Sequence, residues 1–266
     1  MLFFLAFCVS AQSGLKIIVE ENEGKLTIIR SQGKTKELII PETINDMPVT
    51  GIGEGAFIRR GLTLVAIPDS VTEIGEGAFS YNELTTLVIG DSVETIGRRA
   101  FSNNKLKDLK LGSGIKSIGM GAFADNNLIK VELPPDLTDI EPYAFFYNKL
   151  AELVIPDSVT AIGEGAFSNN RIYSVVIGGS VEAIGDGAFY NNRLTSIVIP
   201  GSVNAMGKRV FESRITKRAS VPPVDYLDEN GELLHTTANN FDAYFLSTGE
   251  RPGKYTYSRD GWAYEE

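Results

Sequence analysis

The chain has 266 residues and a formal net charge of −9 at pH 7, from 34 acidic and 25 basic side chains. Nucleic-acid phosphates require a positive surface, so an acidic chain without a basic cluster is not expected to bind nucleic acid. The same charge argues against docking on an anionic membrane, and an acidic surface favours solubility and a basic partner.

The first eleven residues, MLFFLAFCVSA, form a short apolar run that ends in small side chains. This pattern predicts a signal peptide over residues 1–11, with cleavage after Ala11. The alternative is a lipoprotein acylated at Cys8, although Phe7 fits the required motif poorly. No Lys or Arg opens the run, which leaves open a start codon further upstream. Both interpretations predict an exported protein, secreted or associated with a cell surface, without membrane insertion once the signal is removed.

Residues 12–37 are expected to form a β-hairpin N-cap. Residues 16–20 and 25–30 alternate apolar and polar side chains on either side of Glu21-Asn22-Glu23-Gly24. Such a hairpin would cover the exposed apolar end of a repeat array, as terminal caps must.

From residue 38 to 215 the chain repeats itself. Eight phenylalanines stand 22 residues apart, at Phe57, Phe79, Phe101, Phe123, Phe145, Phe167, Phe189 and Phe211. A unit this short cannot enclose a core, so the units must stack. Each contains an alternating apolar segment ended by Pro or Gly, a second short extended piece and a glycine turn. The pattern predicts a repeat solenoid of 22-residue coils with a parallel β-sheet face, short extended or turn segments opposite, and little regular helix.

An asparagine recurs three residues after most of these phenylalanines. An inward-facing amide can both donate to and accept from the turning backbone of adjacent coils. We therefore expect a structural ladder rather than a ligand site, made of Asn82, Asn104, Asn126, Asn148, Asn170 and Asn192.

Several segments resemble a known family. Residues 155–167 read IPDSVTAIGEGAF, residues 188–194 read AFYNNRL, and residues 38–53 read LIIPETINDMPVTGIG. These phrases are similar to the BspA-like class of leucine-rich repeats found in bacterial surface antigens, and the resemblance covers residues 38 to about 215. It implies a right-handed leucine-rich-repeat superhelix and a function in adhesion and protein binding at cell surfaces, with no common catalytic site.

The repeat pattern stops after Phe211, and residues 216–266 are expected to form a C-terminal cap or a small β module. Asn230-Gly231 and Asp260-Gly261 are hairpin signals. Aromatic residues flank the second signal, at Tyr255, Tyr257, Trp262 and Tyr264. The cap is favoured, and the alternative is a glycan-binding protein that acts through this aromatic tail.

Nothing in the sequence assembles a catalytic site. His235 is the only histidine and has no evident catalytic neighbours, and no Gly-x-Ser-x-Gly motif is present. The carboxylates at one turn position are expected to face solvent as a stack, at Glu54, Glu76, Glu164 and Asp186. We therefore predict a protein that is not an enzyme and has no cofactor and no metal site.

Binding is instead expected on the outward positions of the strands. Val154, Val176 and Val198 fall in one row, beside Tyr173, Ser174 and Ser196. An exposed apolar strip on an acidic protein often marks a contact surface, although valine is also a good strand residue. The sequence predicts a protein partner there, such as a host or bacterial surface protein, next to a patch of alternating charge in which Lys130 lies near Glu152.

Overall fold

The structure is a computed structural model. It describes residues 14–194, 197 and 199–211, and the backbone of further strands at residues 5–10, 224–227, 233–236, 254–258 and 261–265. The chain divides into two compact units, Met1–Leu128 and Ile129–Glu266, which we describe separately. The described residues contain β-strands and turns and no helix.

The first unit begins with a small antiparallel arrangement. β2 (Lys16–Asn22) and β3 (Lys25–Gln32) form the hairpin expected from the alternating pattern. β1 (Leu5–Ser10) pairs with β2 along its whole length. On its other side β3 pairs in parallel with β6 (Met47–Ile52), which also pairs with the short β5 (Thr43–Ile44). The hairpin therefore extends the sheet of the first coil.

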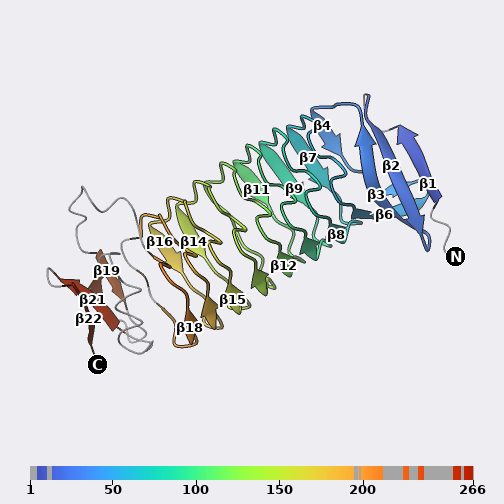
Figure 1. Cartoon of the computed structure of the whole chain (residues 1–266). Helices are drawn as coiled ribbons and strands as arrows, with labels where there is room; N and C mark the ends of the chain where they lie inside the picture. The colour runs from blue at the N-terminus through green and yellow to red at the C-terminus, as the bar shows by residue number, and fades with distance from the viewer. Residues whose placement is uncertain are drawn as a thin grey trace. The chain divides into compact units, whose positions relative to one another are not determined.

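The coils of the first unit stack through two parallel sheets (Figure 1). The first sheet continues from β6 through β8 (Glu73–Ile74), β10 (Thr95–Ile96) and β12 (Ser117–Ile118). The second contains β4 (Glu37–Ile39), β7 (Leu64–Ile67), β9 (Thr86–Ile89) and β11 (Asp108–Lys110). We call the outward side of the second sheet the strand face.

The second unit repeats this plan. β13 (Asp139–Ile140), β15 (Ala161–Ile162), β17 (Ala183–Ile184) and β18 (Ala205–Met206) form one parallel sheet. The equivalent of the first unit's second sheet contains β14 (Glu152–Val154) paired with β16 (Ser174–Val176). Its outward side is the strand face of the second unit. The predicted solenoid is confirmed in both units. Only one parallel sheet was predicted, and the structure shows two because the second extended piece of each coil also aligns with its equivalents.

Stacked phenylalanines fill the interior of each unit. In the first unit the ring centroids of Phe57, Phe79, Phe101 and Phe123 follow one another at 5.1, 5.2 and 5.4 Å. In the second unit those of Phe145, Phe167, Phe189 and Phe211 follow at 5.3, 5.5 and 5.6 Å. All eight rings are buried. One coil thus supplies one face of each ring contact, which is why a single coil has no complete core.

The repeated asparagines lie buried beside the rings and hydrogen-bond to backbone of their own and the preceding coil. In the first unit, Asn82 Nδ2 donates to the carbonyls of Phe57 (2.8 Å) and Phe79 (2.9 Å), while its Oδ1 accepts from the amide of Leu62 (3.1 Å). In the second unit, Asn170 makes the same bonds to Phe145, Phe167 and Leu150. The amide thereby satisfies backbone groups that water cannot reach.

The C-terminal strands pair as two hairpins. β19 (Val224–Leu227) is antiparallel to β20 (Leu233–Thr236), and β21 (Lys254–Ser258) is antiparallel to β22 (Gly261–Glu265). Both lie where the turn signals predicted them. Gly261 is the first residue of β22 and pairs with Ser258, so it belongs to a strand and not to the predicted turn.

Candidate binding groove on the strand face

The strand face of the second unit is interrupted. β14 pairs in register with β16, so that Glu152 lies opposite Ser174 and Val154 opposite Val176. The preceding coil of the same unit contributes residues 130–133 at the equivalent repeat position, and these are not in a strand. The two coils remain joined nearby, where the amide of Ala151 donates to the carbonyl of Ile129 (3.3 Å) and β13 pairs with β15. The sheet is therefore open beside β14 while the stack stays intact.

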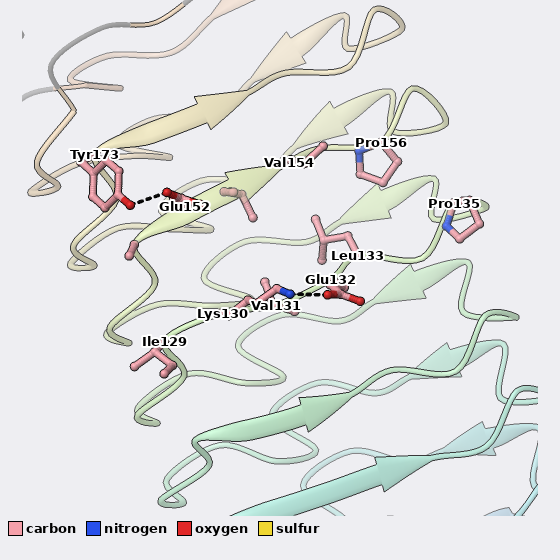
Figure 2. A pocket seen from close by; sticks show the side chains of 12 residues that line it. Ile129, Lys130, Val131, Glu132, Leu133, Pro135, Glu152, Val154, Pro156 and Tyr173 are labelled. Carbon is pink, nitrogen blue, oxygen red and sulfur yellow. Dashed lines mark hydrogen bonds and ion pairs between the residues drawn. The ribbon is translucent and has the colours of Figure 1, made fainter. Parts of the chain in front are cut away.

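A groove of about 600 Å³ fills this opening, and we call it the strand-face groove. Figure 2 shows its two walls, one from residues 129–135 and the other from β14 and its flanking residues. The lining is mostly apolar and includes Ile129, Val131, Leu133, Leu153, Val154 and Tyr173. Its size and apolar lining are those of a binding cleft.

Pro135 gives a physical reason for the opening. In the next coil, Asp157 occupies the equivalent turn position, and its Oδ1 accepts the amide of Gly179 at 2.8 Å. A proline at position 135 has no carboxylate with which to accept the amide of Asp157, and it has no amide hydrogen of its own. One intercoil hydrogen bond is therefore replaced by a bulky ring at the end of the groove.

Two polar pairs border the groove. Lys130 forms an ion pair with Glu132 of its own coil, and this contact raises the pKa of Lys130 and lowers that of Glu132. The hydroxyl of Tyr173 donates to the carboxylate of Glu152, which raises the pKa of the tyrosine because the hydrogen bond favours the protonated phenol. Both pairs are exposed, so they orient side chains more than they stabilise the fold. Lys130 was expected to lie near Glu152. Instead, Lys130 pairs with Glu132 and Glu152 with Tyr173.

The predicted apolar strip overlaps the groove, because Val154 and Tyr173 line it and Val176 lies beside it. Val154 is 62% exposed, Val176 58% and Tyr173 47%, and Ser174 is also exposed. Ile129, which was not predicted as a binding residue, is 59% exposed on the opposite wall. Ser196 and Val198 lie outside the described residues. The Pro134-Pro135 pair, in place of the usual Pro or Gly followed by Asp, Ser or Gly, was the sequence signal that this coil departs from the repeat.

An apolar outward row is not in itself special to the second unit. In the first unit, Ile39, Ala66 and Val88 lie opposite one another in register, and Ile39 is 57% exposed. There, however, four neighbouring strands pair continuously from β4 to β11. The valines alone therefore do not single out the second unit, in which a groove lies beside β14.

The described residues form no cluster of metal ligands. Within them, no group of three His, Cys, Asp or Glu side chains is placed to hold a metal ion. His235 lies in β20 opposite Asp225, and the surroundings of its side chain fall outside the described part of the chain. The same residues include no helix with the length and apolar character needed to cross a membrane.

The sequence pattern of the BspA type leucine rich repeat region matches residues 31–151 and 94–218, in six copies. The chain belongs to this family. No curated protein sequence matches it significantly.

Solved structures of bacterial repeat proteins are similar to this chain. A leucine rich cell surface protein from Faecalibacterium prausnitzii A2-165 is 25% identical with a TM-score of 0.54, over 86% of this chain and 60% of that one. A leucine-rich repeat protein from Bacteroides ovatus ATCC 8483 is 27% identical with a TM-score of 0.57, over 76% and 62% of the respective chains. The pneumococcal vaccine antigen PcpA shares the fold at 18% identity, with a TM-score of 0.56 over 77% and 67%. The match thus spans about 60% of the length of the first two proteins.

Proposed function

We propose that the chain is an exported, non-enzymatic protein that binds a protein partner at a cell surface through the strand face of its second unit. The observation that carries this proposal is the strand-face groove, which opens beside the exposed Val154, Val176 and Tyr173. Membership in a family of leucine-rich repeats supports it, as does the likeness to a bacterial cell surface protein.

The groove offers the elements of a protein contact. Burying an exposed valine side chain completely is worth about 1.5–3 kcal/mol, and an aromatic residue such as Tyr173 contributes a large contact area that loses little conformational entropy. Polar groups at Lys130, Glu132 and Glu152 surround the apolar centre. An apolar centre with a polar rim is the usual composition of a protein interface.

The overall charge of −9 favours a partner with a basic surface, since complementary potentials speed association and exclude partners of like charge. This preference acts on the rate of association more than on the contact itself. We therefore expect the association rate to fall as ionic strength rises, with a smaller effect on dissociation.

Export is part of the proposal. Cleavage after Ala11 would remove β1 and leave β2 still paired with β3. N-terminal sequencing of protein recovered from the cell envelope or the medium tests this directly. A mature chain that begins at residue 12 supports export by cleavage, whereas an intact N-terminus in cytoplasmic fractions would exclude it.

Charge reversal on the strand face tests the binding role. The full chain and its Val176→Glu and Val154→Glu variants are assayed by surface plasmon resonance against a panel of purified host and bacterial surface proteins. We expect saturable binding by the wild type and at least a tenfold loss in both variants, because each would place a charge in the apolar contact.

Val88→Glu is the matched control, since Val88 occupies the same repeat position on the strand face of the first unit. It should bind like the wild type, and the circular dichroism spectra of all variants should agree. Binding that survives both Val176→Glu and Val154→Glu would rule out the second unit's strand face as the contact site.

A further inference from the structure

A second hollow lies on a different edge of the second unit, along the turns that precede and follow the stacked phenylalanines. It has a volume of about 440 Å³, and we call it the turn groove. Gly165 and Gly187 line it between aromatic side chains of neighbouring coils, Tyr143, Phe146 and Tyr190. None of these residues belongs to the strand-face groove.

The repeat does not require an aromatic residue at position 143. The residue two before each stacked phenylalanine adopts a positive φ, and at this position the next two coils have glycine, Gly165 (φ 57°) and Gly187 (φ 59°). Tyr143 occupies it with φ 60°. A left-handed backbone is unfavourable for a bulky residue and natural for glycine. The tyrosine is therefore held there against the local backbone preference.

The other two aromatic side chains also replace small residues. Phe146 and Tyr190 stand directly after a stacked phenylalanine, where most other coils have a small residue, Ser80, Ser102, Ala124 or Ser168, and one coil has Ile58. Packing of the solenoid core does not depend on a large side chain there, because those serine coils stack equally well. The fold therefore does not require an aromatic side chain at any of these three positions.

The aromatic side chains are fixed in place. A Cβ atom on Gly165 would come within 2.5 Å of the Tyr143 ring, so the absence of that side chain is what admits the ring. The Tyr143 and Phe146 rings meet edge to face, with centroids 5.9 Å apart at 85°. The guanidinium of Arg209 lies 4.8 Å from the centre of the Tyr190 ring. These contacts give the turn groove rigid aromatic walls at both ends.

Hydrogen-bonding groups lie between the aromatic walls. The Tyr143 hydroxyl donates to a carboxylate oxygen of Glu164, which raises the pKa of the tyrosine and leaves the second carboxylate oxygen for another donor. Asp186 accepts the amide of Lys208 at 2.8 Å through Oδ1. Asn169 accepts from Asn191 at 2.8 Å, and Nδ2 of Asn169 remains a donor. Planar carboxylate and amide groups in this position can bond to neighbouring hydroxyls of one ligand.

We propose that the turn groove is a binding site for a neutral oligosaccharide. A sugar ring presents C–H groups on its faces, which stack on the negative face of an aromatic ring, and hydroxyls around its edge, which bond to carboxylates and amides. The groove supplies both kinds of group. Its charge also points to a neutral ligand, because the carboxylates of Glu164 and Asp186 are balanced by the cations of Lys208 and Arg209.

The test replaces each aromatic residue by the residue that other coils have at the same repeat position. Isothermal titration calorimetry and ligand-observed NMR measure binding of the full chain to cellopentaose, maltopentaose, mannopentaose and chitopentaose. We expect at least one of these probes to bind saturably. Tyr143→Gly and Phe146→Ser should each weaken that binding about tenfold or more, since each removes a stacking surface. The fold should persist because glycine and serine are the residues that other coils carry at these positions.

Arg99→Gly is the matched control. Arg99 occupies the same repeat position in the first unit and also has a positive φ (52°). It should bind the sugar like the wild type, and all variants should keep the wild-type unfolding midpoint within a few degrees. Trp262→Ala in the aromatic tail should also leave binding intact, which separates this site from a glycan site in that tail.

Three outcomes would overturn the proposal. One is the absence of binding to all four oligosaccharides. Another is binding that Tyr143→Gly and Phe146→Ser leave unchanged or that Trp262→Ala abolishes. The third is that a lysine-rich peptide, and none of the sugars, binds in a manner sensitive to Tyr143→Gly. The strand-face variant Val176→Glu should retain sugar binding, so failure here and failure of the proposed protein contact are distinguishable.

Discussion

The two units share a 22-residue plan and differ in how the strand face is completed. In the first unit, Asp69 accepts the amide of Asp91 (2.7 Å) and Asp91 accepts the amide of Ser113 (2.9 Å), beside four continuously paired strands. In the second unit, Pro135 stands where such an aspartate would be, and a groove lies beside β14. A repeat protein can therefore create a site by omitting one repeated contact while the core ladder continues.

If the cores of the two units are equally stable, removing one buried asparagine amide from each should lower the stability by a similar amount. This loss of stability is the largest effect that we expect. Asn104→Ala and Asn170→Ala should each leave three or more buried backbone groups without partners, at about 1–3 kcal/mol for each group. Urea unfolding followed by circular dichroism measures the loss. Similar losses in both variants support equal cores, and a much smaller loss for Asn170→Ala would show that the second unit's ladder is weaker.

Restoring the missing contact should remove the difference between the units. Pro135→Asp would supply a carboxylate for the amide of Asp157, as Asp157 does for Gly179. We expect a gain of about 0.5–1.5 kcal/mol from one hydrogen bond, together with weaker partner binding as the groove narrows. Thermal unfolding and surface plasmon resonance measure the two effects.

The reverse change in the first unit is the control for that experiment. Asp69→Ala removes the acceptor of the Asp91 amide and should cost a similar amount without affecting partner binding. If Pro135→Asp left both stability and binding unchanged, the proline would not be the cause of the opening.

The smallest expected effect is a dependence on acidic pH in the first unit. The pKa of Asp91 is lowered, first because its carboxylate accepts the backbone amide of Ser113, with a minor contribution from Lys110. The contribution of Asp91 to stability is therefore present above its unfolded pKa of about 3.9 and is lost as pH falls through the lower folded value. An NMR titration of the Asp91 side chain should give a value below that of a model peptide, and an ordinary value would contradict the hydrogen-bond ladder.

The fold could largely be predicted from the sequence because each coil repeats the same pattern of buried residues. A phenylalanine every 22 residues and an asparagine three positions later fit a stack with one hydrophobic interior, and the structure buries those rings and hydrogen-bonds those amides. The second extended piece of each coil was predicted, but its pairing into a second parallel sheet was missed, since a two-residue strand such as β10 has too few residues to reveal its partners.

The binding surfaces were harder to predict from the sequence than the fold. Val154, Tyr173 and Val176 were selected from the register of the strands, and all three are exposed. Ile129 and Leu133 were not selected, because a groove depends on how far two coils separate and not on the residues of one strand. Glu164 and Asp186 were predicted as a stack facing solvent, and the structure places them in the turn groove with Tyr143 and Tyr190.

Spacing along the chain was enough to establish the repeat, its strands and its inward ladders, because those follow from contacts that every coil makes with the next. The location of the two grooves was decided by the tertiary structure. Each depends on the few side chains that depart from the repeat, Pro135 on the strand face and Tyr143 at the turns, and on how their neighbours pack around them. A departure in sequence shows that something is different at a position, but only the packing shows whether it opens a cavity, fills one or leaves the surface unchanged.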